Sequence, residues 1–347
     1  MKLVFVTQQV DPADPVLGAT VAKLRALAGR VDELVVLSLG AVPDALPQNA
    51  RVVTFGARTK LGRGLRFARA LAGELRGADA VLAHMCPIYA VLAAPLARPV
   101  RVPVLLWFAH WNRTRLLRAA ARVSNVLLSV DRRSFPVDTP KLVPIGHGID
   151  FSTLPCRERA RVSETQSPLR AVVLGRTSPA KGIETILRAV ALVPEMRLDV
   201  YGTSGSPEEE RHRGELERLV GELGIGDRAA IRAPVPRHRI SDVHAAADVL
   251  VNNMKPGAPD KAVYEACGSC LPVLASNPSF DELFEGIEPR LRFDRESADD
   301  LAGRLRELGA LAPEERDAIG RTLRERVLAR HSVESWAERV VTLVRDA

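Results

Sequence analysis

The chain lacks several features that would assign it to common protein classes. None of its apolar runs reaches the roughly 18 uninterrupted residues that a membrane-spanning helix needs. The amino terminus, Met1–Thr7, passes directly into an apolar run without the cleavage site of a secretory leader. The sequence therefore predicts a cytoplasmic protein.

Cysteine is scarce. Cys86, Cys156, Cys267 and Cys270 are too few and too unevenly placed for a disulfide framework, so we expect four reduced thiols. Cys267 and Cys270 have the C-x-x-C spacing of zinc and redox sites, but the other two do not form the second pair that a four-cysteine zinc site needs. We predict that the pair packs between a helix and a strand.

Aromatic residues are few, and two common motifs are missing. Only 4% of the residues are Phe, Trp or Tyr, and no nucleic-acid-binding motif is present, which argues against a nucleic acid partner. The G-x-G-x-x-G fingerprint is absent as well, which weakens assignment to the dinucleotide-dependent dehydrogenases.

Length and charge indicate two dissimilar halves. With 347 residues, 46% of them hydrophobic, the chain suits two domains. Residues 1–165 carry 23 Lys and Arg against 12 Asp and Glu, a net charge of +11, whereas the remainder carries 26 against 30, a net charge of −4. A basic half suits an anionic membrane surface or a phosphorylated ligand.

The first half alternates apolar runs with stretches of helical spacing such as Ala19–Ala28. The predicted strands are Leu3–Thr7, Glu33–Leu39, Arg51–Phe55, Ala80–Ala83, Val102–Phe108 and Asn125–Val130. Such alternation implies right-handed crossovers and a parallel sheet covered on both faces. We expect a Rossmann-like domain at 1–160.

The second half repeats this pattern after a connecting segment, Leu154–Ser167, which is polar and charged. Its predicted strands begin at Arg170 and continue at Leu198–Thr203, Ala229–Arg232, Ala246–Val251 and Leu271–Ala275. Ser332–Val344 has the spacing of an amphipathic helix. We expect a second Rossmann-like domain at 161–330, and a helix at 331–347 that crosses back to the first.

The stretch Leu250–Ser276 predicts a strand, a loop, a helix and a second strand. In an open parallel sheet, ligands bind beyond the carboxyl ends of the strands, where a helix begins with free backbone N–H groups. An earlier loop, which follows the strand from Arg170, has Gly175 for close approach, and Arg176 and Lys181 as two cations. A guanidinium and an ammonium at one place suit a diphosphate.

Three further side chains fit a ligand site at such strand ends. Glu265 lies on the helix of that stretch, where a carboxylate can accept the hydroxyls of a ribose. His110 directly follows a strand and can hydrogen-bond a sugar hydroxyl. His84 also ends a strand and is a second candidate for contact with an acceptor. Gly18, in the first strand-to-helix loop, either eases the turn or admits a phosphate.

Residues 58–76 predict a basic amphipathic helix with Leu61 and Leu65 on its apolar stripe. Its cations include Arg63, Arg66 and Arg69. Such a helix can lie on an anionic bilayer, to which each cation contributes about 1 kcal/mol. The alternative is a solvated helix whose leucines face the core.

The motifs of the second half, taken in order, resemble those of the retaining glycosyltransferases of family 4. They are Arg176 with Lys181–Gly182, the Val200–Thr203 turn with Gly202, Ala247–Leu250, Glu265–Gly268, Pro272–Ser276, and Trp336 near the end. The resemblance is specific from about 143 to 280 and looser before that. It implies an α/β, GT-B fold, in which two Rossmann-like domains with parallel sheets face a central cleft, and a reaction that needs no metal or other cofactor.

The resemblance also implies roles for single residues. Arg176 and Lys181 would hold the diphosphate of a nucleotide sugar, Glu265 its ribose, and His110 a hydroxyl of the transferred sugar. Gly18 would lie near the phosphates. The donor-binding loop would comprise Gly257, Ala258, Asp260 and Lys261. The family commonly has a glutamate where this chain has Gly257, so either Asp260 contacts the sugar ring instead, or the donor is held differently, or activity is lost.

The predicted function is transfer of a sugar from a nucleotide-diphosphate sugar to a hydroxyl, with retention, in the assembly of a polysaccharide, glycolipid or other glycan. The basic first half favours a lipid-linked acceptor and attachment to the inner face of the plasma membrane. Two alternatives remain. One is an epimerase or phosphorylase on the same fold, and the other is a partner subunit that has lost the chemistry.

Overall fold

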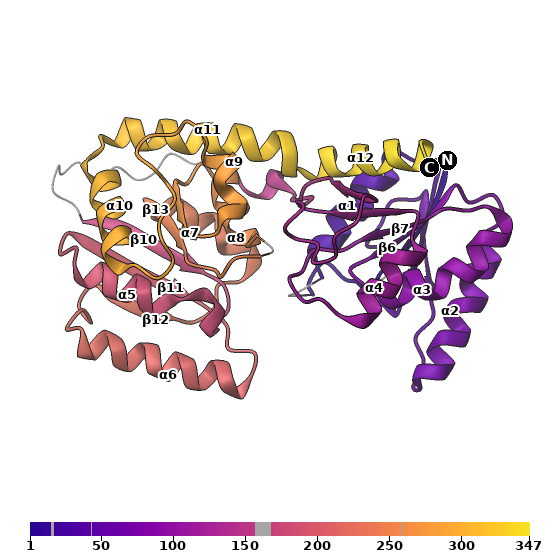
Figure 1. The fold of residues 1–347 in the computed structure, drawn as a ribbon, viewed down its shortest axis with the longest axis horizontal. Helices are drawn as coiled ribbons and strands as arrows, with labels where there is room; N and C mark the ends of the chain where they lie inside the picture. The colour runs from indigo at the N-terminus through magenta and orange to yellow at the C-terminus, as the bar shows by residue number, and fades with distance from the viewer. Residues whose placement is uncertain (15–16, 43, 157–167, 258) are drawn as a thin grey trace. The chain divides into compact units, whose positions relative to one another are not determined.

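The computed structural model describes residues 1–14, 17–42, 44–156, 168–257 and 259–347. The chain divides into two compact units, which are described separately. Unit 1 comprises Met1–Asp150 together with Arg330–Ala347, and unit 2 comprises Phe151–Ala329 (Figure 1). The predicted boundary at 160/161 and most of the expected connecting segment lie outside the described residues, as does Ala258.

Unit 1 contains a parallel sheet of seven strands in the order β5-β3-β1-β6-β7-β8-β9. Their bounds are β1 Lys2–Val6, β3 Glu33–Ser38, β5 Ala50–Thr54, β6 Ala80–His84, β7 Val104–Trp107, β8 Val126–Ser129 and β9 Leu142–Pro144; β2 Gln9–Val10 pairs separately with β4 Gly40–Ala41. The central strands are buried on both sides, which explains their continuous rather than alternating apolar runs.

Helices cover both faces of this sheet (Figure 1). They are α1 Ala19–Ala28, α2 Lys60–Glu74, α3 Pro87–Ala97, α4 Arg115–Val123 and α12 Val333–Arg345, with a short 3₁₀ turn η1 at Arg98–Val100. Helices α2, α3 and α4 pack next to one another, and α12 packs against α1. Alternate residues of β1 face the two layers, since Val4 and Val6 join the core under α2 and α3, while Phe5 stacks on His84.

Unit 2 has a parallel sheet of five strands in the order β12-β11-β10-β13-β14. The strands are β10 Leu169–Leu174, β11 Met196–Tyr201, β12 Ala229–Arg232, β13 Val249–Asn252 and β14 Val273–Ala275. The helices are α5 Ile183–Ala191, α6 Pro207–Glu222, α7 Ile240–Ala246, α8 Lys261–Gly268, α9 Asp281–Phe284, α10 Ala298–Ala310 and α11 Pro313–His331, the last of which ends in unit 1. Four 3₁₀ turns are η2 Phe151–Thr153, η3 Pro179–Lys181, η4 Arg237–Arg239 and η5 Pro278–Phe280.

The strand order places one reversal in each sheet. In unit 1 the chain runs outward from β1 through β3 to β5 and then returns to the other side of β1 with β6. In unit 2 the same reversal lies between β10 and β13. Loops at the carboxyl ends of the two strands beside such a reversal diverge to opposite sides of the sheet and leave a ligand crevice there. The α/β fold with two Rossmann-like sheets is confirmed.

The prediction of four reduced cysteines is wrong. Cys156 and Cys270 form a disulfide in unit 2, with Cα atoms 5.2 Å apart, while Cys86 and Cys267 are buried free thiols. The pairing depends on a distant contact, since the turn after α8 meets the segment that follows η2, 114 residues earlier in the chain. Sequence spacing alone does not report such a contact.

The described residues contain neither a membrane-spanning helix nor a cluster of metal-binding side chains. No helix there combines the length and apolarity needed to cross a bilayer. Nor do His, Cys, Asp and Glu side chains gather there in a group of three or more that could bind a metal ion.

Candidate donor site

Lys181 lies at the reversal of the second sheet. The chain leaves β10 at Leu174, passes through Gly175 and Arg176, and makes the turn η3 that ends at Lys181. Lys181 is only 8% exposed, and its Nζ lies 3.5 Å from the carbonyl oxygen of Leu174. Its ammonium is thereby directed back to the end of β10, into the place where the strand order predicts a ligand.

Glycines make room for this lysine. A Cβ on Gly175 would lie 2.6 Å from the Lys181 Nζ, and Gly175 has a φ of +130°, which side chains rarely adopt. A Cβ on Gly202, which follows β11, would lie 2.5 Å from the carbonyl oxygen of Gly175. Gly175 therefore makes room for the ammonium, and Gly202 allows the loop after β11 to pack against Gly175.

Asp260 is the partner of Lys181. Its Oδ2 accepts a hydrogen bond from Lys181 Nζ and another, of 2.7 Å, from Asn252 Nδ2 at the end of β13. Its Oδ1 accepts from the backbone N–H of Ala262 at 3.3 Å, which caps α8. Burial opposes ionisation of Asp260, but the charge of Lys181 and these hydrogen bonds together hold its pKa below the usual value. Asp260 is therefore a carboxylate at neutral pH.

Arg176 is bound by Glu209 on α6. Its Nε lies 2.8 Å and its Nη2 2.5 Å from Oε1 of Glu209. The guanidinium is 64% exposed, whereas the carboxylate is 5% exposed and also accepts from the backbone N–H of Gly205 at 2.6 Å. Burial raises the pKa of Glu209, but the bonds from Arg176 and Gly205 outweigh it and lower the pKa overall. The two predicted cations thus have separate carboxylate partners.

Glu265 forms a second charged cluster on α8. Its Oε1 lies 3.0 Å from Nζ of Lys261, one turn earlier, and 3.0 Å from Nη1 of Arg237 in η4. The Glu265 carboxylate is 12% exposed. Its burial is outweighed by the two cations, so its pKa is lowered. The structure brings Lys261 to Glu265 and Asp260 to Lys181, so the adjacent residues Asp260 and Lys261 take part in separate ion pairs.

Hydrogen bonds hold the loop from Asn253 to Gly257 against neighbouring segments of unit 2. The backbone N–H of Lys255 donates to the carbonyl oxygen of Ala180 at 3.0 Å, and the Ser279 hydroxyl donates to that of Gly257 at 3.0 Å. Gly257 has a φ of +132°, a conformation that a glutamate at this position would adopt only with strain. The missing glutamate and the backbone geometry are therefore consistent with each other.

Sequence reasoning missed Asn252, Glu209 and Arg237. Ser206-Pro-Glu-Glu209 carries the S-x-x-E signature of a capped helix start, and the Ser206 hydroxyl does accept the Glu209 N–H at 3.3 Å. That signature could have located Glu209 at the first turn of α6. Its contact with Arg176 depends on tertiary structure and has no local signal.

In unit 1, His110 follows β7 at the carboxyl edge of the sheet. Its ring stacks on Trp111, with ring centroids 4.9 Å apart, and its Nδ1 accepts from the backbone N–H of Asn112 at 3.0 Å. That bond fixes the ring and leaves the proton of a neutral imidazole on Nε2. A donor at Nε2 suits a hydroxyl or other oxygen acceptor.

His84 is enclosed instead. It is 4% exposed and stacks between Phe5 and Trp107, with centroid distances of 5.3 and 4.8 Å. Lys23 Nζ lies 3.5 Å from its Nε2 and 3.8 Å from the centre of the Trp107 ring. Burial, and then the charge of Lys23, lowers the pKa of His84 well below its usual value, so the ring is neutral. In this structure His84 is a core residue of unit 1.

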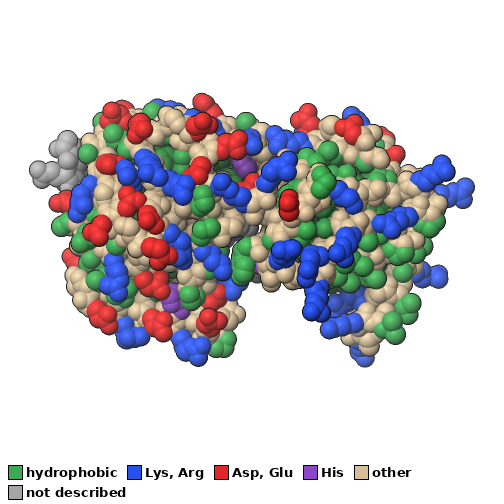
Figure 2. Space-filling view, viewed as in Figure 1, with side chains coloured by type: hydrophobic (Ala, Val, Ile, Leu, Met, Phe, Trp, Pro, Cys, Tyr) green, Lys and Arg blue, Asp and Glu red, His purple; other side chains and the backbone are tan. Residues whose placement is uncertain are grey.

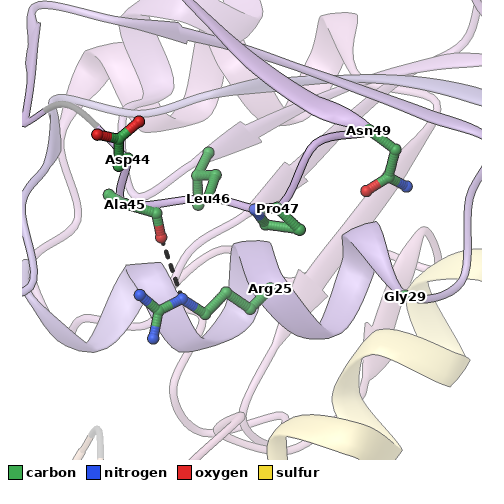
Figure 3. Close-up of a pocket in the computed structure, with 7 residues that line it drawn as sticks. All are labelled: Arg25, Gly29, Asp44, Ala45, Leu46, Pro47 and Asn49. Carbon is green, nitrogen blue, oxygen red and sulfur yellow. Dashed lines mark hydrogen bonds between the residues drawn. The ribbon is translucent and has the colours of Figure 1, made fainter.

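Gly18 and a nearby pocket are explained by local packing. A Cβ on Gly18 would lie 2.6 Å from the carbonyl oxygens of Pro12 and Asp14, so the turn itself requires glycine. Figure 3 shows an open pocket beside α1, in which Arg25 Nε donates to the carbonyl oxygen of Ala45 at 3.0 Å. Asn49 closes the far end of that pocket near the amino ends of the strands, away from the edge where ligands of such sheets bind.

Helix α2 exposes part of its apolar stripe. Phe67 and Leu71 face the core, but Leu61 and Leu65 are 76% and 64% exposed. Its only acid, Glu74, is bound to Arg51 and Lys2. Figure 2 shows Lys and Arg side chains among apolar ones over the part of unit 1 where α2 and α4 lie. Arg66 and Arg69 are exposed, while Arg63 is half-buried.

The fold is the GT-B fold of glycosyltransferases. Anabaena HepE in complex with UDP superimposes with a TM-score of 0.79 at 17% identity, and the match covers 100% of both chains. Sucrose-phosphate synthase from Thermosynechococcus elongatus superimposes with a TM-score of 0.76 at 18% identity over 99% of this chain and 98% of that one. At such identities the likeness defines the fold.

Residues 176–342 match the model of the family described as glycosyl transferase-like. The predicted resemblance is confirmed for this part of the chain. Among curated relatives, the D-inositol 3-phosphate glycosyltransferase of Streptomyces scabiei is 29% identical over 183 residues, 48% of this chain and 41% of that protein. Its counterpart in Mycolicibacterium smegmatis is 35% identical over 109 residues, or 30% and 24%. The chain thus matches less than half the length of these relatives.

Proposed function

We propose that this protein is a retaining glycosyltransferase that moves a sugar from a nucleoside diphosphate to a hydroxyl acceptor. The observation that carries the proposal is the buried Lys181 ammonium, held against Gly175 at the reversal of the second sheet. The family match of residues 176–342 supports it, as does the binding of UDP by the structurally similar HepE.

The proposed chemistry depends on charge that develops as the sugar leaves. Departure of the nucleoside diphosphate builds negative charge on its phosphate oxygens. Lys181, Arg176 and the first backbone N–H groups of α8 stabilise that charge more in the transition state than before it. Glu265 receives the ribose. The acceptor hydroxyl attacks from the side on which the phosphate departs, and a phosphate oxygen takes its proton.

Two observations favour a second candidate, a partner subunit that does not act on a nucleotide-sugar donor. Gly257 stands where a glutamate is common, and Lys181 is already neutralised by Asp260. The two proposals differ in what they require of the site. A transferase must still bind a nucleoside diphosphate, whereas a partner subunit need not.

A nucleotide screen tests the proposed function. We expect UDP or another nucleoside diphosphate, such as GDP, to raise the melting temperature and to give a calorimetric binding isotherm, because only the folded protein binds it. Incubation with the matching nucleotide sugar and candidate acceptors should then release the nucleoside diphosphate. No response to any nucleoside diphosphate would favour the partner subunit, and a changed sugar without an acceptor would favour an epimerase.

We further propose that the acceptor is a glycan or lipid-linked glycan met at an anionic membrane, at the inner face of the plasma membrane. The support is the exposed pair Leu61 and Leu65, bordered by Lys60 and by Arg66 and Arg69. Such a surface combines apolar area for the lipid boundary with cations for its headgroups.

Replacing Leu61 and Leu65 by serine is expected to weaken binding to vesicles rich in anionic phospholipid, measured by flotation, by about a hundredfold or more, since the two leucines together lose about 3 kcal/mol or more of burial in the bilayer. The matched control is Leu192→Ser in unit 2, where the leucine is also exposed. Equal flotation of the double variant and the control would show that α2 does not dock on membranes.

A further inference from the structure

Asp260 occupies an unusual place for a carboxylate in a site that takes phosphates. It caps the first turn of α8, and the start of a helix is where backbone N–H groups and the helix dipole attract an anion. The same carboxylate binds the Lys181 ammonium and the Asn252 amide. It therefore already uses one cation, one side-chain donor and one backbone donor that an incoming phosphate would seek.

The carboxylate is held firmly and stays charged. Its side chain is 16% exposed and that of Lys181 is 10% exposed, so water screens the pair weakly. Its pKa is lowered despite the burial, and the cap on Ala262 ties it to α8. The site that a ligand meets therefore carries the negative charge of Asp260.

Arg176 offers a contrast. Its partner, Glu209, is also a buried carboxylate, but the guanidinium itself is 64% exposed and has further N–H groups for a second anion. Lys181 has a compact ammonium enclosed by the loops, and the carboxylate of Asp260 neutralises it at close range. Pairing with a carboxylate therefore weakens the attraction of Lys181 for a second anion more than it weakens that of Arg176.

We propose that Asp260 is an internal competitor of the donor diphosphate, which neutralises Lys181 and lowers the affinity of the site for diphosphate groups. The proposal rests on the proposed function, since it names the residue that limits binding at that same site. An incoming diphosphate therefore meets the Lys181–Asp260 pair, whose net charge is zero, instead of an unpaired cation. Affinity then depends more on Arg176 and on the nucleoside.

The test is Asp260→Asn. Asparagine has nearly the same shape, is an equally good helix cap and can still accept from Asn252, but carries no charge. By calorimetry, we expect the dissociation constant for UDP, or for whichever nucleoside diphosphate the wild type prefers, to fall by about tenfold or more. The gain should be much smaller for the corresponding nucleoside monophosphate, which brings less charge to Lys181. Asp199→Asn, at an exposed ion pair of β11 with Arg232, is the matched control and should change neither.

Melting curves give an independent readout. Without ligand, Asp260→Asn should melt below the wild type because Lys181 loses its partner, yet the diphosphate should raise its melting temperature more than that of the wild type. Unchanged or weaker diphosphate binding by a folded Asp260→Asn variant would overturn the proposal and leave the proposed function intact. If neither protein binds any nucleoside diphosphate, the proposed function fails, and this inference with it. Binding by the variant alone would support this inference, but the failure of the wild type to bind would favour the partner subunit over the transferase.

Discussion

Replacing Lys181 with alanine is expected to lower kcat/KM for sugar transfer by about a hundredfold or more. A single preorganised donor aimed at developing charge is typically worth about 10² to 10³ in rate, and Lys181 is the buried cation at the reversal of the second sheet. The measurement is release of nucleoside diphosphate from the nucleotide sugar that the wild type uses. Activity within about threefold of the wild type would remove Lys181 from the proposed mechanism.

A neutral double variant separates chemistry from folding. Lys181→Ala leaves Asp260 buried without its cation, which can cost about 3 to 5 kcal/mol of stability. Lys181→Met with Asp260→Asn removes both charges and keeps their approximate volumes. We expect this double variant to melt close to the wild type and to remain as inactive as Lys181→Ala. Recovery of turnover would show that Lys181 serves stability alone.

Trp336→Ala is expected to have the largest effect on stability, about 3 to 5 kcal/mol in the free energy of unfolding. Trp336 on α12 is fully buried, its ring meets that of Trp107 edge-on at a centroid distance of 6.4 Å, and Lys23 Nζ lies 5.0 Å from the ring centre. Loss of the indole leaves a cavity beside a buried cation. Denaturant unfolding followed by circular dichroism measures the change.

The control is Trp111→Ala, because Trp111 is 44% exposed. Truncating it should cost less than about 1 kcal/mol. Because unit 2 has its own core, the Trp336 variant should also show a second, less affected transition. Equal losses in the two tryptophan variants would contradict the burial of α12 against α1.

The fold was predictable because each long strand or helix shows its pattern of apolar residues within its own stretch of sequence. Each strand of the two sheets except β9 is a short apolar run, and each of these lies within about three residues of its predicted bounds, as for β10, expected from Arg170 and observed at Leu169–Leu174. The short strand β9 and the small pair β2 and β4 have no comparable run. Apolar periodicity reports burial on a long element, and these elements are too short to show it.

The site was predictable in part. Gly175, Lys181 and Asp260 were expected in neighbouring loops, and the structure brings these three together. The guanidinium of Arg176 is bound by Glu209 on α6 instead. Carboxylate partners, the disulfide and the enclosure of His84 depend on contacts between residues far apart in the sequence. Their residue types alone do not distinguish a ligand contact from an internal one.

The order of synthesis matters for a protein built in this way. Unit 2 is inserted within unit 1, whose chain leaves at Asp150 and resumes at Arg330. On the ribosome, all of unit 2 is made before the helix that carries Trp336, so it can fold while the first sheet still waits for that cover. A chain that ends before Arg330 would lack that helix and leave the Phe5–His84–Trp107 stack without the cover of Trp336, and an exposed apolar surface of this kind favours aggregation.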